Sequence, residues 1–267
     1  MRVKFGILLF FIPLWVFAQV SLLSWNIQNL GKSKSPSTIA FIAKTVKPYD
    51  VLAIQEVVAG NGGAQAVAQL ADELNRTGAK WNYCISDPTQ TYGKTTERYA
   101  FLWKPSRVKL VGKAWLEKRF AQQIEREPYM ATFEQQGKQL TLVSFHAVPK
   151  SKQPEQEIKL LAQVTQEYPN LNLLFLGDFN CPQSNSVFTN FRKQHYQSAL
   201  VNQKTSLKRN CKNGNCLASE YDNMFYDARK LSCAKPQALP FYLQFENLSL
   251  AKKISDHVPI VGEFSFN

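Results

Sequence analysis

The chain has 267 residues, 45% of them apolar and 19% charged, which excludes an intrinsically disordered protein and leaves room for one large domain with a substantial core. Its 32 lysines and arginines outnumber 20 acidic residues, so the formal net charge is +12. Surplus positive charge is equally compatible with binding to nucleic acid, binding to an anionic surface or simple solubility, so charge alone assigns no partner.

The N-terminus has the pattern of a cleavable export signal. Arg2 and Lys4 precede an apolar run over residues 5–17, and the small residue Ala18 ends it. A membrane anchor is the alternative, but the run is shorter than the roughly 20 residues that span a bilayer. We therefore expect residues 1–18 to be removed and residues 19–267 to be secreted, extracellular or periplasmic, as one monomeric domain without membrane contact. Removal leaves 30 basic residues (32 minus 2) against 20 acidic ones, a net charge of about +10.

Strands and helices are expected to alternate along the mature chain. Apolar runs predict buried strands at residues 20–25 and 50–54, and Ser35-Pro36 before spaced apolar residues predicts a helix between them. Further strands are predicted at residues 81–86, 99–103, 107–115, 128–134, 139–145 and 171–176, and further helices at residues 64–74 and 154–168. Hairpins mixed with strand-helix-strand crossovers predict an α/β sandwich of mixed sheets with helices packed outside.

The cysteine count permits disulfides in an exported chain but leaves at least one thiol unpaired. The five cysteines are Cys84, Cys181, Cys211, Cys216 and Cys233. Cys211 and Cys216 flank the turn-like sequence Lys-Asn-Gly-Asn, which could bring them together, although Cys181 is a rival partner for either.

Polar side chains with metal-binding or acid/base chemistry follow or precede several predicted strands. They are Asn26, Glu56, His146, Asp178, Asn180, Asp256 and His257. Each alone is more often a turn former or helix cap, but two of the three histidines of the chain occupy such positions. Strand ends of an α/β sandwich can converge on one rim, so these residues are candidates for a shared site. His195 follows a probable helix and is expected at the surface.

Eight short motifs occur in an order that resembles the endonuclease/exonuclease/phosphatase superfamily and, within it, deoxyribonuclease I. The motifs are Trp25-Asn26-Ile27-Gln28-Asn29, Ile54-Gln55-Glu56-Val57, Glu97-Arg98-Tyr99, Arg126-Glu127-Pro128, Phe145-His146-Ala147-Val148-Pro149, Gly177-Asp178-Phe179-Asn180, Tyr221-Asp222 and Ser255-Asp256-His257. The resemblance runs from about residue 22 to 264 and implies two packed mixed β-sheets flanked by helices, a four-layer α/β sandwich.

The resemblance also implies metal-dependent hydrolysis of a phosphodiester by water. Glu56 would be the principal metal carboxylate, aided by Asn26, and the hard oxygen ligands suit Mg²⁺, with Mn²⁺ or Ca²⁺ as alternatives. Asp178, Asn180 and Asp256 would hold a second metal, the phosphate or the histidines.

Two histidine and carboxylate pairs would supply general acid/base catalysis. By resemblance, His257 with Asp222 takes the proton of the attacking water, and His146 with Glu97 protonates the leaving oxygen. Substrate contacts would come from Arg126, Asn180, Tyr221 and Arg98, with the guanidinium of Arg126 on the phosphate backbone.

The departures from the family pattern concern contact with DNA. Gln28, Val58 and Thr95 stand where deoxyribonuclease I has residues that touch the minor groove, which puts double-strand preference in doubt. Nearby basic residues, namely Lys32, Lys34, Lys94 and Arg98, are candidates to compensate through phosphate contacts. The family's disulfide would be replaced here by Cys181 with Cys211 or Cys216.

The preferred function is therefore a secreted DNA endonuclease of little sequence specificity. The alternatives are a relative acting on phospholipid headgroups or small phosphoesters, and a non-catalytic binding protein on this scaffold. An abasic-site repair enzyme is disfavoured by the export signal.

Overall fold

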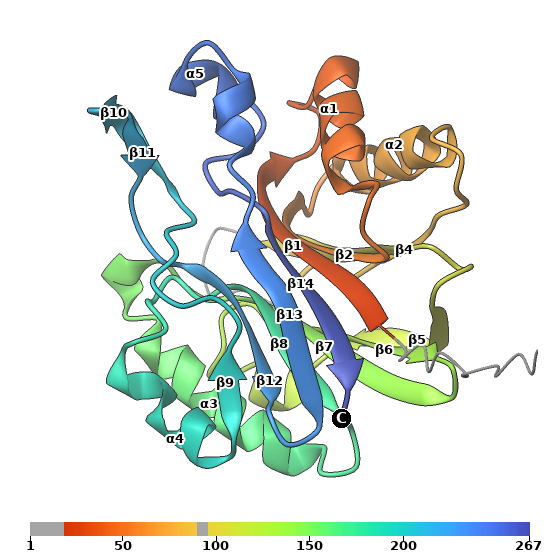
Figure 1. The fold of residues 1–267 in the computed structure, drawn as a ribbon, viewed down its shortest axis with the longest axis vertical. Helices are drawn as coiled ribbons and strands as arrows, with labels where there is room; N and C mark the ends of the chain where they lie inside the picture. Colours follow the sequence, from red (N-terminus) through yellow and green to blue (C-terminus); the bar gives the residue numbers. More distant parts are fainter. Residues whose placement is uncertain (1–18, 90–95) are drawn as a thin grey trace, which may run out of the picture.

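Two six-stranded β-sheets pack face to face, and helices cover the outer face of each, which gives four layers (Figure 1). This computed structural model describes residues 19–89 and 96–267, so the predicted export signal lies outside the described residues. The predicted four-layer α/β sandwich is confirmed. Among the described residues, no helix is long and apolar enough to span a membrane.

The first sheet has the order β13-β14-β1-β2-β4-β3 and comprises Leu231–Ala238, Ile260–Phe266, Gln19–Leu30, Val51–Val58, Glu97–Trp103 and Asn82–Ile85. The second has the order β5-β6-β7-β8-β12-β9 and comprises Lys109–Leu116, Tyr129–Gln135, Lys138–His146, Leu173–Asp178, Asp222–Asp227 and Tyr196–Ser198. A separate hairpin pairs β10 (Leu207–Lys212) with β11 (Asn215–Leu217). The α-helices are α1 (Pro36–Val46), α2 (Gly63–Asn75), α3 (Glu155–Glu167), α4 (Thr189–Lys193) and α5 (Leu248–Ala251), and the 3₁₀ helices are η1 (Lys118–Phe120), η2 (Lys150–Lys152), η3 (Ser186–Phe188) and η4 (Phe241–Gln244).

Alternating side chains along the strands build the three apolar layers between these four. In β1, Leu22 faces the opposite sheet, whereas Leu23 faces the layer of α1 and α2. In β8, Leu174 faces the sheet interface and Phe175 packs with residues of α3 and α4. Each fully buried side chain of this size contributes about 1.5–3 kcal/mol, so a one-residue slip of either central strand would be costly.

Two parallel crossovers bring the carboxyl ends of four strands to one rim. β1, α1 and β2 form one unit and β7, α3 and β8 the other, while the remaining strand pairs within the two sheets are antiparallel. In the second sheet, His146 pairs with Asp178 in register, and Asp178 pairs with Asp222 on the other side. A row of three polar residues therefore crosses three adjacent strands, facing the Asn26 and Gln55 pair of the first sheet.

The sequence located most elements of the first two-thirds of the chain. Ser35 caps α1 by accepting a hydrogen bond from Thr38 N at 3.2 Å, with Pro36 in the first turn, as predicted. The predicted limits of β1 and β2 were too short, because both strands continue past irregularities in their pairing and include Asn26 and Glu56. His195 is exposed after α4, as expected.

The disulfide links Cys211 and Cys216, which confirms the interpretation of the intervening turn. Asn213 and Gly214 both have left-handed backbones, with φ of 49° and 75°, as a two-residue hairpin turn requires. The pairing with Cys181 implied by the family resemblance was wrong: the turn holds Cys211 and Cys216 at the tip of a hairpin, and Cys181 is a free, buried thiol.

Candidate active site

A cleft of about 650 Å³ opens at the rim where the four strand ends meet. Its lining includes Asn29, Glu56, Glu97, Glu125, Arg126, His146, Lys152, Asp178, Asn180 and His257. Most of these were predicted as site residues from motifs that are widely separated in the sequence. The fold brings them together because the two parallel pairs, β1 with β2 and β7 with β8, have their carboxyl ends at the same rim.

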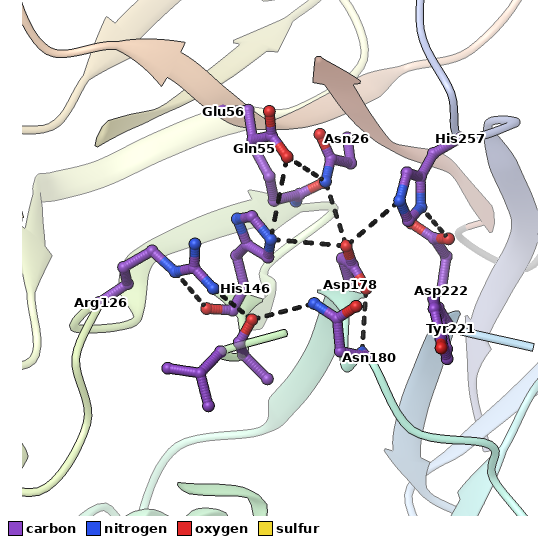
Figure 2. Close-up of polar contacts among 12 residues, drawn as sticks. Asn26, Gln55, Glu56, Arg126, His146, Asp178, Asn180, Tyr221, Asp222 and His257 are labelled. Atoms are coloured by element: carbon purple, nitrogen blue, oxygen red, sulfur yellow. Dashed lines mark hydrogen bonds and ion pairs between the residues drawn. The ribbon is translucent and has the colours of Figure 1, made fainter. Parts of the chain in front are cut away.

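His146 is held from behind by Glu97. Its Nδ1 lies 2.9 and 3.0 Å from the two carboxylate oxygens of Glu97. Its Nε2 therefore faces the cleft, toward Asp178 and Glu56 (Figure 2). Arg126 fixes this pair: Nε donates to His146 O at 3.0 Å, Nη2 donates to Ala147 O, and Nη1 lies 3.5 Å from Glu97 Oε2. The guanidinium predicted to bind phosphate is thus largely occupied in positioning His146.

His257 forms a matching pair on the opposite side. Its Nδ1 lies 2.7 Å from Asp222 Oδ2, and the backbone N–H of Asp222 donates to Thr205 Oγ1 at 2.9 Å. Ser255 Oγ accepts from His257 N at 3.0 Å and donates to the carbonyl of Asn26 at 2.6 Å, which ties the segment before His257 to β1.

Asp178 lies between the two histidines. Its Oδ2 is 3.5 Å from His146 Nε2 and 3.6 Å from His257 Nε2, and it accepts a hydrogen bond from Asn26 Nδ2 at 3.1 Å (Figure 2). Asn180 closes this turn by donating its backbone N–H to Asp178 Oδ1 at 2.9 Å. One carboxylate therefore sets the relative position of both imidazoles.

Glu56 and Asn26 place oxygen ligands beside this carboxylate. Glu56 Oε1 accepts from Asn26 Nδ2 at 2.9 Å and lies 4.0 Å from His146 Nε2, while Asn29 N donates to Glu56 Oε2 at 3.2 Å. Glu56 and Asn29 both have left-handed backbones, with φ of 60° and 52°, which such residues adopt at an energetic cost. These left-handed conformations occur where the pairing of β1 with β2 is irregular, and both side chains line the cleft.

These residues fit a hard divalent cation. Asn26 Oδ1 is buried without a hydrogen-bond partner among the described residues, an arrangement that normally costs about 1–3 kcal/mol. Carboxylate oxygens of Glu56 and Asp178 bind the same amide group. An unsatisfied amide oxygen next to two carboxylates is the ligand chemistry of Mg²⁺, Mn²⁺ or Ca²⁺. A second cluster of close ligand atoms comprises Asp178, Asp222 and His257.

Charge interactions dominate the titration of the first pair. Burial raises the pKa of Glu97, but the charges of His146 and Arg126 outweigh it and leave the pKa below its usual value. Burial lowers the pKa of His146, but the charge and hydrogen bond of Glu97 together with the charge of Asp178 outweigh it and leave the pKa above its usual value, so the imidazolium form is favoured. A protonated His146 is the form that a general acid requires.

In the second pair the pKa of both groups is raised. Burial raises the pKa of Asp222 to about 6, although the charge of His257 opposes this rise. Burial lowers the pKa of His257, but Asp222 and Asp178 raise it well above 6.5. For Asp178, burial raises the pKa, but the two histidines lower it below its usual value. To act as a base, His257 must lose its proton, and a divalent cation close by would favour that loss by adding positive charge.

His257 makes a contribution to stability that can be tested in chelator. Because the pKa of His257 is higher in the folded chain than its ordinary 6.5, the contribution is complete below about pH 6.5 and is lost as pH rises through the folded pKa. We expect the difference in free energy of unfolding between the native protein and His257→Asn to shrink as pH rises from 6.5. Denaturant melts across this range measure it, and a constant difference would contradict the assignment.

Five predicted site residues lie outside the set that lines this cleft. Two of them, Asn26 and Asp222, contact cleft residues directly as described above. The other three are Arg98, Asp256 and Tyr221. Arg98 donates to Ala59 O at 3.2 Å and Ser86 O at 2.7 Å, so it joins two loops. Asp256 accepts from Gln28 Nε2 at 3.1 Å. Tyr221 donates its backbone N–H to Thr205 Oγ1 at 3.1 Å.

Lys34 is also used internally. It is buried and donates to the carbonyls of Lys253 and Ile254 at 3.1 and 2.7 Å, which makes it a support for the segment before His257. Lys94 and Thr95 lie outside the described residues.

Several supporting residues were missed by the sequence analysis. Gln55 is fully buried and donates to Ser144 Oγ at 2.8 Å, joining the two sheets directly beneath the cleft. Glu157 of α3 accepts from Glu125 N at 2.6 Å and Val148 N at 2.8 Å, which fixes the cleft wall. Gln55 belongs to one of the eight motifs and Ser144 directly precedes another, which was the hint that the sequence offered. Glu157 lies within the predicted helix at residues 154–168 and was not singled out.

Known proteins share this architecture. A model of the Endonuclease/Exonuclease/phosphatase family matches residues 23–257. The chain is 29% identical to a deoxyribonuclease from Thioalkalivibrio sp. (strain K90mix), over 100% of this chain and 77% of that protein, and 26% identical to deoxyribonuclease-1 from Rattus norvegicus, over 96% and 95%. A solved mannosyl-6-phosphatase from Bacteroides thetaiotaomicron superposes with a TM-score of 0.68 at 16% identity, covering 92% of this chain and 100% of that one, a likeness of fold alone.

Proposed function

The chain belongs to the endonuclease/exonuclease/phosphatase family, and we propose that within it this protein is a secreted, metal-dependent endonuclease that hydrolyses DNA phosphodiester bonds with little sequence specificity. The observation that carries the proposal is the pair of carboxylate-backed histidines, whose Nε2 atoms lie 3.5 and 3.6 Å from one oxygen of Asp178. The two relatives named deoxyribonuclease support DNA as the substrate. The apolar run at residues 5–17 supports export.

In the proposed reaction the two histidines move protons on opposite sides of one phosphate. His257 Nε2 takes the proton of the attacking water, and Asp222 on Nδ1 stabilises the imidazolium that forms. His146 Nε2 gives a proton to the leaving oxygen, with Glu97 holding the ring and Arg126 holding Glu97. No covalent intermediate with the protein is required.

Glu56, Asn26 and Asp178 are the residues that would hold the cation. When bound, a divalent cation supplies positive charge against the phosphate oxygens and so stabilises the charge that develops during attack. Asn180, whose side-chain amide donates to Ala147 O at 3.0 Å, lines the same cleft and is placed to contact the phosphate.

A comparison of substrates tests this proposal. Purified protein in Mg²⁺ with Ca²⁺ is offered supercoiled plasmid, a phosphatidylcholine vesicle and a hexose 6-phosphate, each with and without chelator. The expected result is nicking of the plasmid that chelator abolishes. Hydrolysis of either small substrate with intact plasmid would place the protein in another branch of the family, and no hydrolysis of any substrate would favour the non-catalytic scaffold.

A further inference from the structure

The β10–β11 hairpin stands out from both sheets at the end of the molecule where α5 lies (Figure 1). Residues 201–219 contain four basic side chains and no acidic one, and two lysines follow α5. The six residues are Lys204, Lys208, Arg209, Lys212, Lys252 and Lys253. Within the described part of the chain, none of the six forms an ion pair. The hairpin and the segment after α5 therefore present positive charge that no carboxylate neutralises, although Lys208 Nζ also donates to Asn215 O at 3.2 Å within the hairpin.

The base of the hairpin is joined to the catalytic segments. Ser206 forms a β-bridge with His257, and Leu207 N donates to Asp256 O at 2.7 Å. Thr205 O accepts from Val258 N at 2.7 Å, and its hydroxyl accepts from the N–H of Asp222. The first strand of the hairpin thus begins beside the backbone of His257.

The hairpin is held at both ends. At its base, Leu207 and Leu217 pack in the apolar layer that contains Ala251 and Ile254. At its tip, the disulfide between Cys211 and Cys216 closes the turn. Basic side chains on a held strand lose less conformational freedom on binding than those on a free loop.

The cleft itself is poor in available positive charge. Four carboxylates line it, those of Glu56, Glu97, Glu125 and Asp178. Its arginine and its lysine are already engaged: Arg126 with backbone carbonyls and Glu97, and Lys152 with Glu125 at 3.0 Å. Its two histidines lie against Glu97, Asp222 and Asp178. Even with a divalent cation bound, the rim has too little positive charge to neutralise the phosphates that flank the scissile one. Basic side chains elsewhere on the surface must therefore contact those phosphates.

We propose that the β10–β11 hairpin, with the lysines after α5, binds the phosphate backbone of double-stranded DNA on the His257 side of the scissile phosphate. The six residues of β10 span about 20 Å, equal to about six base pairs along the helix axis. Its phosphate contacts then extend over about half a turn of the duplex. The inference rests on the proposed function for its substrate.

The test compares the triple variant Lys208→Gln, Arg209→Gln, Lys212→Gln with a matched triple variant Lys109→Gln, Lys138→Gln, Lys230→Gln. The control lysines are exposed and lie at the opposite ends of strands from the cleft. Binding of a fluorescent duplex of about 20 base pairs is measured in chelator, where no cleavage occurs, across a salt series. Nicking of plasmid and cleavage of a dinucleotide, which is too short to reach the hairpin, are measured in Mg²⁺.

The hairpin variant is expected to bind the duplex at least about tenfold more weakly near 0.15 M salt, with a salt slope smaller by about 1 for each phosphate that its side chains no longer neutralise. Plasmid nicking should fall in parallel, while dinucleotide cleavage and the control variant stay at the native level. Equal duplex binding by the two triple variants overturns the inference, as does a loss of binding to anionic phospholipid vesicles alone. If the hairpin variant binds the duplex weakly but the native protein cleaves neither substrate, the proposed function fails and the binding surface stands.

Discussion

Replacing His257 by asparagine is expected to lower kcat/KM for nicking of supercoiled plasmid by about 100- to 10,000-fold, the contribution of a general base. The asparagine amide can still donate a hydrogen bond toward Asp222, which lies 2.7 Å from Nδ1 in the native pair. It has no nitrogen that takes a proton from water at the Nε2 position. His146→Asn should fall in the same range, and the double variant should lose much less than the product, because both residues serve one transition state.

His195→Asn is the matched control for these variants. His195 is exposed, lies outside the residues that line the cleft, and has a left-handed backbone with φ of 68° that asparagine tolerates. Full activity is expected. Thermal melts of all variants separate lost chemistry from lost folding, and a folded His257→Asn protein within about threefold of native kcat/KM would remove His257 from the reaction.

Glu56→Gln should abolish the gain in melting temperature that Mg²⁺ or Mn²⁺ gives the native protein. Loss of a residue that only supports a metal ligand lowers metal affinity or activity by about 10- to 100-fold. The loss of a direct ligand should lower kcat/KM by at least as much. Glutamine keeps the shape of the side chain and the left-handed backbone of Glu56, so the change removes charge and little else. Melting curves with increasing metal and plasmid nicking at saturating metal are the two readouts.

Glu125→Gln provides the comparison within the same cleft. Glu125 lines the cleft, but its carboxylate pairs with the exposed Lys152 at 3.0 Å, an interaction that contributes at most about 1 kcal/mol. Metal-dependent stabilisation and nicking should both stay within about twofold of native. Equal stabilisation of Glu56→Gln and native protein by Mg²⁺ would show that the cation binds elsewhere.

The residues that the sequence located well are those whose position along a strand determines where they lie. Asn26, Glu56, His146 and Asp178 all occupy carboxyl-terminal parts of apolar strands, and parallel pairing delivers such positions to one edge. The period of two along each strand also decided which apolar layer each buried side chain joined, since the central strands are buried on both faces. The sequence pattern could not predict which strands pair with each other. For example, β8 pairs with β12, which lies more than forty residues later in the chain.

The residues that the sequence placed poorly are those whose long side chains have a choice of partner. Three basic residues were predicted to contact substrate or its phosphates: Arg126, Arg98 and Lys34. Each instead donates to backbone carbonyls, and no local sequence pattern predicts these contacts. Such contacts depend on which loops meet in space. In the last third of the chain the sequence predicted no strand bounds after residue 176, although β12, β13 and β14 have six to eight residues each. β9 and β11 have only three residues each, too few for an apolar period to appear.

Metal add-back to a single sample tests the central claim most directly. Protein stripped by chelator is mixed with supercoiled plasmid, Mg²⁺ is added in excess, and nicked circles are followed with time beside the His257→Asn variant. We predict no nicking before the addition, nicked circles after it, and a rate for the variant lower by about 100-fold or more. Plasmid that stays intact in Mg²⁺, Mn²⁺ and Ca²⁺, or that the variant nicks at the native rate, would contradict the account.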